Sequence, residues 1–510
     1  MMATMYRPAM RMLASLACAA LVQIAGSSAS AQYQAIFGGN EYDRGTGGVV
    51  QADDGNFVAV GVETSFGTDS NVYVVKSDLC GNLLWARSYD ISGNDEGSKI
   101  RLAKDGGFII AGSTENRNSC CRDAEDEGLQ FEDGFLLKIN SKGDVEWART
   151  YGGRDRDHLF DVQRVPNSEG FYVVGKTASF GAGRYDGWLM EVTATGRVVW
   201  SRTYGDWSRD GLYSLAVAKD STLMAVGETV SYNPGPGRQD LFVVKASGLD
   251  GAPIWTSYYR PPTWAFARGI TLDAAGGAFY IAGIIDGGTS TGGNAYVMKG
   301  NYTTGGVIAN LALHQTGGSN TDELNDIIQL PSGNLLAVGS IGPATPPPAT
   351  NFDAYAVELS PTLVTIWERA YGGTAYEEFW TAAVGFWSPL RYTLMMLGST
   401  TSFGVPGINV YQVHAASSGT SGCYERYPGI TRLQPLVTGT LVQAHWAKVW
   451  VECPAKTVVT KNTLGRVLCN NCYSLEELSG DLSEAGMPGT DDSEGLGDIS
   501  VTEPVRDVVR

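Results

Sequence analysis

The stretch VEWARTYGGRDRD, residues 145–157, recurs in related forms along this chain of 510 residues. VVWSRTYGDWSRD occupies residues 198–210 and TIWERAYGGTAYEE occupies residues 365–378. In each copy an apolar segment ends in Trp, a short polar stretch follows, and an aromatic residue precedes a loop. Repetition of one such phrase predicts a chain built from copies of a single structural unit.

The Trp and Tyr positions of this phrase are filled five times, by Trp85 and Tyr89, Trp147 and Tyr151, Trp200 and Tyr204, Trp255 and Tyr259, and Trp367 and Tyr371. A degenerate copy has Asn310 and His314. No copy follows Tyr411, but YQAIFGG at residues 33–39 matches the phrase, with Tyr33 at the Trp position. A repeat that begins with the last piece of its own unit predicts a closed ring, in which the N-terminal strand completes the final unit.

Two further marks recur seven times each, in register with one another. The first is an apolar run that ends in Gly, at Gly61, Gly112, Gly175, Gly227, Gly283, Gly339 and Gly398. The second is Asp or Asn two residues before an aromatic, at Asn71, Asp133, Asp186, Asp240, Asn294, Asp353 and Asn409. We expect the Gly to give room for a bend or a close neighbour, and the Asp or Asn to end a loop by accepting backbone N–H bonds.

Each unit of roughly 51 to 63 residues holds four short apolar or alternating runs separated by turn signals. The abundance of Gly, 65 residues, with only 18% charged residues suits short strands joined by tight turns. Paired helices do not fit, because the runs are short, β-branched and aromatic. The sequence therefore predicts an all-β fold, a seven-bladed β-propeller of four-stranded blades over residues 32–415, in which the large Trp and Tyr fill the outer gap between blades.

DGGFIIAGSTE at residues 105–115 and DGFLLKINSKGDVEWARTYGG at residues 133–153 carry a family resemblance. They resemble the secreted bacterial β-propeller repeat proteins, whose units read GG…D…DGG-aromatic-VVG…D-W-LVK…G-N-V-W. The resemblance covers roughly residues 33 to 415 and implies the propeller fold, but it implies no particular ligand or activity. The fifth and sixth units depart most, since RPPTWAFARG at residues 260–269 lacks the Gly-Gly and acidic features.

The N-terminus has the parts of a secretory signal peptide over residues 1–31. Arg7 and Arg11 precede an apolar run, and Ala29-Ser30-Ala31 precedes Gln32. We expect a secreted or cell-envelope protein that begins at Gln32, with no membrane span. The formal net charge of −17 disfavours nucleic acid and anionic lipid as partners. Residues 473–510, with ten acidic and two basic residues, are expected to be a disordered acidic tail.

Residues 416–472 are expected to form a small cysteine-rich β extension. Its cysteines, in an exported chain, favour disulfides over zinc, and three pairings are open: Cys423, Cys453, Cys469 and Cys472. Cys120 and Cys121 are a further disulfide candidate in an acidic insertion. There the alternatives are a vicinal disulfide, a metal site or pairing elsewhere. Calcium is possible at this insertion, although a solvated loop is the preferred interpretation, and otherwise we expect no cofactor.

The candidate ligand-binding surface is the face on which the loop between the second and third strands meets the connection to the next blade. It carries aromatic and acidic side chains, namely Phe66, Phe180, Tyr232, Phe403, Asp43, Asp95, Asp157, Asp210, Asp322 and Glu377. These could contact a glycan or a polypeptide; alternatively, the aromatics plug the turns.

No catalytic constellation emerges, and none of the four His has zinc-site spacing. The function favoured is therefore an exported, non-catalytic propeller that binds protein or carbohydrate or serves as a structural module. The alternative is a secreted propeller hydrolase or lyase acting on a polysaccharide, whose carboxylate, Arg or His residues would converge on the central funnel.

Overall fold

The computed structural model describes residues 32–115, 132–232, 239–260, 264–286, 293–315, 321–342, 351–388, 391–404 and 406–422. Beyond these it describes 424–426, 428, 430–433, 438–442, 445–448, 459–462 and 465–470. Among these residues no helix is long and apolar enough to cross a membrane.

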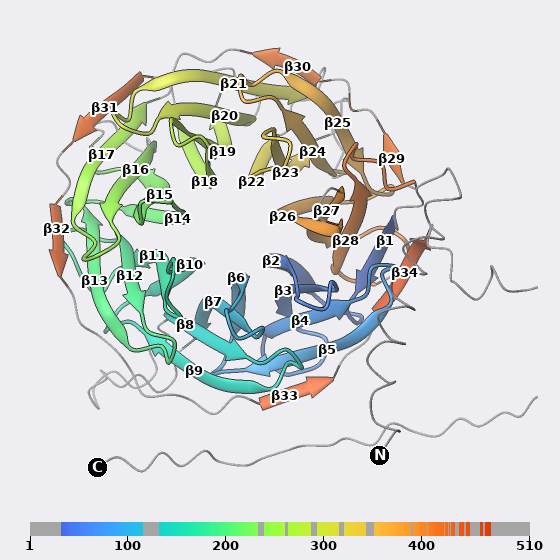
Figure 1. Ribbon diagram of the computed structural model, residues 1–510. Coiled ribbons are helices and arrows are strands. Elements are labelled where there is room, and N and C mark those ends of the chain that lie inside the picture. Colours follow the sequence, from blue (N-terminus) through green and yellow to red (C-terminus); the bar gives the residue numbers. More distant parts are fainter. Residues whose placement is uncertain are drawn as a thin grey trace, which may run out of the picture.

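Seven antiparallel sheets stand around a central channel, which confirms the predicted seven-bladed propeller (Figure 1). From the channel outward, the first three blades are β2 (Asp43–Gln51), β3 (Phe57–Glu63), β4 (Asn71–Ser77) and β5 (Leu83–Asp90); β6 (Asp95–Leu102), β7 (Phe108–Glu115), β8 (Glu132–Ile139) and β9 (Val145–Tyr151); and β10 (Asp157–Arg164), β11 (Phe171–Thr177), β12 (Asp186–Val192) and β13 (Val198–Gly205). The next three are β14 (Asp210–Val217), β15 (Thr222–Thr229), β16 (Asp240–Ser247) and β17 (Pro253–Arg260); β18 (Ala265–Leu272), β19 (Ala278–Asp286), β20 (Gly293–Asn301) and β21 (Val307–Gln315); and β22 (Glu323–Gln329), β23 (Leu335–Ile341), β24 (Asp353–Leu359) and β25 (Thr365–Tyr371).

The seventh blade joins the two ends of the ring. It contains β26 (Glu377–Ser388), β27 (Arg391–Thr400) and β28 (Asn409–Ala416), and its fourth strand is β1 (Tyr33–Phe37) from the N-terminal side of the first blade. Tyr33 pairs with His414 and Phe37 with Val410. The predicted closure by residues 33–37 is therefore confirmed.

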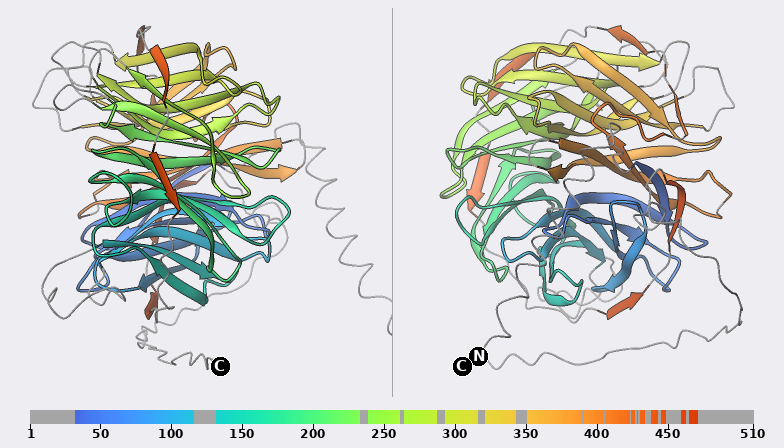
Figure 2. Two further views of the ribbon diagram at one scale, coloured as in Figure 1. Left: turned by 90° about the vertical axis from the view of Figure 1, so that its left-hand side faces the viewer. Right: turned by 45° about the vertical axis from the view of Figure 1, so that its right-hand side comes forward.

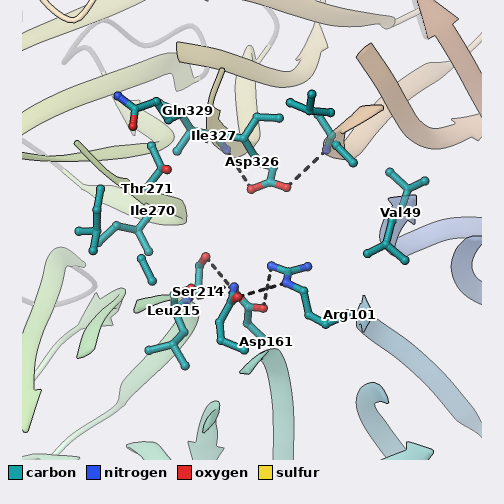
Figure 3. A pocket seen from close by; sticks show the side chains of 18 of the residues that line it. Val49, Arg101, Asp161, Ser214, Leu215, Ile270, Thr271, Asp326, Ile327 and Gln329 are labelled. Carbon is teal, nitrogen blue, oxygen red and sulfur yellow. Dashed lines mark hydrogen bonds and ion pairs between the residues drawn. The ribbon is translucent and has the colours of Figure 1, made fainter. Parts of the chain in front are cut away.

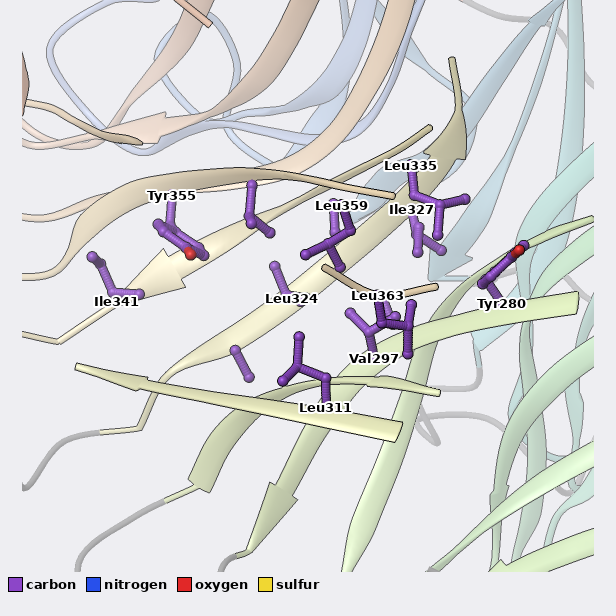
Figure 4. Close-up of a cluster of buried hydrophobic side chains, with 14 of the residues drawn as sticks. Tyr280, Val297, Leu311, Leu324, Ile327, Leu335, Ile341, Tyr355, Leu359 and Leu363 are labelled. Atoms are coloured by element: carbon purple, nitrogen blue, oxygen red, sulfur yellow. The ribbon is translucent and has the colours of Figure 1, made fainter. Parts of the chain in front are cut away.

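Apolar side chains fill every interface between neighbouring blades. Figure 4 shows one such cluster, between the fifth and sixth blades, in which Tyr280 and Val297 face Leu324, Ile327 and Leu335. Six further clusters of the same kind lie between the other pairs of neighbouring blades. Because burial of apolar surface contributes about 25 cal/mol per Å², these interfaces hold the ring together.

The repeated Trp and Tyr join each blade to the next at the outer rim. The Tyr89 hydroxyl donates a 2.6 Å hydrogen bond to the carbonyl oxygen of Gly143, which lies in a turn of the following blade. Gly143 has a φ of 86°, and a Cβ there would lie 3.2 Å from the Trp85 ring. The same Tyr-to-Gly bond recurs for Tyr151, Tyr204, Tyr259 and Tyr371. The outer-gap role predicted for these aromatics is thus confirmed.

Short strands after residue 424 lie on the outside of six blades, where Figure 1 draws them in orange and red. They are β29 (Glu425–Arg426) on β25, β30 (Ile430–Leu433) on β21, β31 (Thr438–Val442) on β17, β32 (His445–Lys448) on β13, β33 (Val459–Asn462) on β5 and β34 (Gly465–Asn470) on β1. We call β29 to β34 the outer belt. It runs around the ring in the order opposite to that of the blades (Figure 1), and Figure 2 shows its strands on the outer side of the ring.

The outer belt shows how the described part of residues 416–472 is attached to the propeller. We expected a small cysteine-rich β extension; its described part does consist of short strands, and these pair with the blades and not with one another. Six blades thereby gain a fifth strand, whereas the sheet β6 to β9 has four strands in the part of the chain that the structure describes.

Candidate binding site at the mouth of the central channel

The seven repeated glycines determine how the innermost strands run. A Cβ added at Gly175 would overlap the carbonyl oxygen of His158 on the neighbouring inner strand. The other six meet the equivalent oxygen of their own inner strand in the same way: Gly61, Gly112, Gly227, Gly283, Gly339 and Gly398. The close neighbour expected at this position is therefore confirmed, and it is the backbone of the channel strand.

Opposite each of these glycines the inner strand has a β-bulge. In β10 the pairing passes from Leu159 opposite Gly175 to Asp161 opposite Val174, so that Phe160 is left unpaired. The register shifts at the same place in the other inner strands, β6, β14, β18, β22, β26 and β2; in β2 three residues, 45–47, lie between the paired Arg44 and Gly48. A bulge re-aims the side chain of its extra residue and is common beside functional sites.

The bulged residues line one chamber at the end of the channel where the inner strands begin. They are Thr46, Ser98, Phe160, Tyr213, Arg268, Asn325 and Trp380, one from each blade. We call this cavity, of about 390 Å³, the upper chamber. Its wall also includes Arg44, Glu96, Lys99, Glu132, His158 and Lys176. A cavity of this size is within the range of small-ligand sites, roughly 300–1,000 Å³.

Four of the bulged residues present polar atoms that are buried and have no hydrogen-bond partner within the described part of the chain. These atoms are Thr46 Oγ1, Arg268 Nε, Asn325 Oδ1 and Trp380 Nε1. A buried donor or acceptor left without a partner costs about 1–3 kcal/mol, and native proteins contain few of them. Convergence of four in one cavity indicates a place where a polar ligand completes the hydrogen bonding.

Aromatic rings stand beside these polar atoms. The Phe160 and Tyr213 ring centroids are 4.9 Å apart, and His158 stacks on Phe160 at 5.8 Å. The Arg44 guanidinium lies 5.3 Å from the centre of the Trp380 ring. The chamber therefore combines flat apolar surfaces with convergent hydrogen-bonding groups, the combination typical of ligand pockets.

Of the six Lys, Arg and Glu side chains that line the chamber, three have an ion-pair partner among the described residues, namely Arg44, Lys99 and Glu132. Arg44 forms a 3.0 Å ion pair with Glu378, and His158 Nε2 lies 3.0 Å from the Glu132 carboxylate. The hydrogen bond from His158 holds the pKa of Glu132 below its usual range. Two cations, Arg268 and Lys176, have no ion-pair partner within 4.0 Å among the described residues.

Two tyrosines near the chamber donate to carboxylates. The Tyr213 hydroxyl is 2.6 Å from Glu228 Oε1, and the Tyr376 hydroxyl is 2.6 Å from Glu378 Oε2. Burial, followed by the adjacent negative charge, raises the pKa of both phenols well above the usual value. Both tyrosines are therefore protonated donors near neutral pH.

A layer of buried ion pairs forms the floor of the upper chamber. Lys99 Nζ lies 3.1 Å from Asp326, which also accepts a 2.7 Å hydrogen bond from the Thr381 hydroxyl. Burial alone would raise the pKa of Asp326, but Lys99 and Thr381 hold it below its usual range. Beside this group, Arg101 forms a 3.3 Å ion pair with Asp161.

Below this layer, at the other end of the channel, is a second cavity of about 640 Å³, the lower chamber (Figure 3). Val49, Leu215, Ile270 and Ile327 contribute apolar walls, and Arg101, Asp161 and Asp326 also line the cavity. None of the described residues that line it has a buried polar atom without a partner. The two chambers therefore differ in kind, and only the upper one has unmet hydrogen-bonding capacity.

The acidic residues predicted to form the ligand surface lie in the loops of that face but are buried. Asp43, Asp95, Asp157, Asp210, Asp322 and Glu377 are each at most 1% exposed. Asp157 accepts from the Gly153 amide at 2.9 Å and from the Ser179 hydroxyl at 2.6 Å, and so ties together the two loops of its face. Burial raises the pKa of Asp95 to about 7. The expectation that these carboxylates are exposed is wrong, because the tight loops need buried acceptors for their amides.

The aromatic residues of the same predicted surface are half-buried and pack downward. Phe66, Phe180, Tyr232 and Phe403 lie about 6 Å, centroid to centroid, from Tyr73, Trp188, Phe242 and Tyr411 respectively. They fit the turn-plug alternative. Ligand binding by these ten residues stays a prediction, but their geometry is that of residues that hold loops.

The predictions about cysteine and metal fall largely outside the described residues. Cys120, Cys121, Cys423, Cys453 and Cys472 are not among them, and neither is the insertion proposed to bind calcium. Cys469 is in β34, on the outer belt. Cys80, which we did not propose, is disulfide-bonded. Within the described ranges no group of three or more His, Cys, Asp or Glu residues could hold a metal ion.

Comparison with known proteins adds little to this site. No family model matches the sequence. Regulatory protein FlaEY of Caulobacter vibrioides is 28% identical over 114 residues, which are 22% of this chain and 12% of that protein. The matched stretch thus spans about an eighth of the relative.

Solved structures resemble the chain only distantly. A protein of unknown function from Dyadobacter fermentans has a TM-score of 0.40 at 12% identity, covering 75% of this chain and 98% of that one. A mutant NanB sialidase from Streptococcus pneumoniae has a TM-score of 0.37 at 13% identity, covering 77% and 70%. No ligand or activity follows from likeness at this level. The class is set by the sheets described above: a seven-bladed β-propeller with a ligand-sized chamber at its mouth.

Proposed function

We propose that this protein is an exported, non-catalytic β-propeller that binds a carbohydrate in the upper chamber. The observation that carries the proposal is the set of buried, unpartnered polar atoms on Thr46, Arg268, Asn325 and Trp380. Sugar hydroxyls both donate and accept, so a single sugar can meet two donors, an acceptor and a hydroxyl at once. Export is proposed from the signal-like segment at residues 1–31.

Carbohydrate fits this chamber better than a folded protein partner does. The unmet polar atoms lie inside a cavity of about 390 Å³ and not on a flat exposed surface. Protein interfaces bury about 800 Å² on each partner, whereas a sugar ring placed against Phe160, Tyr213 or Trp380 needs only a small pocket. The aromatic rings supply apolar contact for the C–H face of the sugar.

A binding role is favoured over hydrolysis because two carboxylates beside the chamber, Glu378 and Glu132, are engaged. Glu378 pairs with Arg44 and accepts from Tyr376, and Glu132 pairs with His158. A general acid needs a raised pKa, and His158 lowers that of Glu132. The hydrolase alternative rests on Glu323, whose pKa is raised by burial and which starts an inner strand.

The test is a glycan array on the mature chain, residues 32–510, followed by calorimetric titration of the best glycan. Trp380→Phe removes the unpartnered Nε1 donor, and we expect binding to weaken about tenfold. Trp207→Phe is the matched control, because Trp207 is 64% exposed outside the chamber; its affinity should not change.

Three results would count against the proposal. The first is an array on which no glycan binds. The second is a Trp380→Phe protein that binds as tightly as the wild type while melting at the same temperature. The third is hydrolysis: the protein releases reducing ends from a polysaccharide, and Glu323→Gln abolishes this release. That result would favour the hydrolase instead.

A further inference from the structure

We infer that the sugar held in the upper chamber carries an anionic substituent, a carboxylate or a sulfate. The inference rests on the proposed function and goes further, since it specifies the class of sugar. It comes from the two cations that reach the chamber without an ion-pair partner among the described residues, Arg268 and Lys176.

The balance of charge in the wall is positive. Among the residues that line the upper chamber, the fixed charges are four basic, Arg44, Lys99, Lys176 and Arg268, against two acidic, Glu96 and Glu132. Of the basic residues, Arg44 and Lys99 are neutralised by Glu378 and Asp326, which stand behind them. Of the acidic ones, Glu132 is paired with His158 and Glu96 is exposed at the rim. The cations of this lining that have no ion pair among the described residues are therefore Arg268 and Lys176, against Glu96 as the acidic residue without one; the charge of Glu323, outside the lining, also acts on Arg268.

Arg268 is positioned by a contact with an aromatic ring but has a hydrogen-bond donor without an acceptor in the described chain. It is the bulged residue of β18, and its guanidinium lies 5.7 Å from the centre of the Phe266 ring. Its Nε is buried without a hydrogen-bond partner in the described chain. Guanidinium groups bind carboxylates and sulfates through two parallel N–H bonds, and a free Nε offers one side of such a pair.

Lys176 approaches from the second strand of the third blade. Its ammonium lies 5.5 Å from the centre of the Phe160 ring and 5.0 Å from that of Tyr185. Burial lowers the pKa of Lys176, and the more distant Glu228 and Glu132 oppose that effect only in part. An anion in the chamber would stabilise the charged ammonium, whereas with a neutral sugar the cost of burial would be opposed only in part, by Glu228 and Glu132.

The acidity of the whole chain does not oppose an anionic ligand. The formal net charge is −17, but carboxylates in the loops of this face, including Asp43, Asp157 and Asp210, are buried and hydrogen-bonded to loop groups. At physiological salt, fields from exposed charges are screened beyond about 8 Å. The charge of the ligand that the chamber prefers is therefore determined mainly by Arg268 and Lys176.

The experiment compares matched sugars. Methyl glycosides of glucose, galactose and mannose are titrated calorimetrically against their uronic acids and 6-sulfates, using the mature protein. We expect at least one charged form to bind tenfold or more tightly than its neutral counterpart, and this preference to fall as salt is raised.

Arg268→Gln and Lys176→Gln should each reduce that preference about tenfold, because each removes a charge-assisted contact. Lys219→Gln is the matched control, since Lys219 is exposed and outside the chamber. Melting temperatures verify that the variants fold. Equal binding of charged and neutral sugars, or a charged preference that survives both substitutions, would overturn this inference and leave the proposed function standing. Failure of every sugar to bind would overturn both.

Discussion

At the scale of single residues, one glycine in each blade links the repeat to the candidate site. Because Gly175 and its six equivalents have no Cβ, the carbonyl of the inner strand can sit against them, and the inner strand can bulge. The bulge then aims a side chain into the channel. The glycine that recurs in every blade thus positions the bulged residue of the inner strand, whose type differs from blade to blade.

Substitution of one such glycine should destabilise the fold. In Gly175→Ala the added methyl would overlap the His158 carbonyl, which is backbone and has little freedom to move. We expect a loss of about 2 kcal/mol in the free energy of unfolding, as for other overpacked interiors. Gly277→Ala is the control, because a Cβ added at Gly277 would meet no heavy atom within 4 Å; its effect should stay within about 0.5 kcal/mol.

Urea denaturation of the two variants measures this difference. If Gly175→Ala and Gly277→Ala unfold at the same urea concentration, the close approach of the inner strand is not what the glycine provides.

His414 should make stability depend on pH in a defined window. Burial among Tyr33 and Phe57 lowers the pKa of His414 to about 4, from an ordinary value of 6.5. Between these values the unfolded chain binds the proton and the folded chain does not, so stability falls as the pH falls from 6.5 towards 4. The stability of the wild type relative to His414→Gln should decrease from pH 7 to pH 5.

Denaturant unfolding at pH 8, 7 and 5 checks this expectation. The difference between the two proteins should be constant from pH 8 to pH 7. A difference that is also constant down to pH 5 would show that His414 titrates alike in both states.

The residues of the upper chamber were not predicted, although the sequence holds a signal for them. Each lies three residues after the position that is acidic in six of the seven blades, as Phe160 does after Asp157 and Trp380 after Glu377. Since their types differ from blade to blade, they leave no repeated mark. A position that varies within an otherwise constant unit could have revealed them, whereas the acidic position that we chose recurs because it holds the loops.

At the scale of strands, closure was predictable and the outer belt was not. Residues 33–37 match the repeat, so their place in the seventh blade follows from the pattern. The belt strands are short, match no repeat and pair with blades far away in the sequence: Thr256 at one point faces Val442. Hydrophobic period alone cannot choose such distant partners.

The outer belt should contribute to the stability of the ring. Deleting residues 423–510 would uncover the outer edges of the six blades that the belt now pairs with. Unpaired edges are open to solvent and to aggregation. We expect this truncation to melt at a lower temperature than the full mature chain and to aggregate sooner on heating.

Deleting only residues 473–510 is the control, because that tail follows the last belt strand. Differential scanning calorimetry compares the three proteins. If the long truncation melts like the other two, the belt strands do not stabilise the blades.

At the scale of the whole molecule, seven similar blades make an asymmetric site. The apolar clusters between the blades differ little in kind, so the ring is a scaffold. Among the described residues, the channel that it encloses has two chambers, one with unmet polar atoms and one without. The sequence predicts the number of blades, because packing repeats; the chemistry of the channel depends on seven different side chains meeting in space, which only the closed ring brings together.

The measurement that tests the central claim most directly is a crystal structure of the mature protein with the glycan selected by the array. We predict density for the sugar inside the upper chamber, with oxygen atoms within hydrogen-bonding distance of Arg268 Nε and Trp380 Nε1. Density in the lower chamber, or on the loops that carry Phe66 and Phe180, with the upper chamber unchanged, would contradict the account.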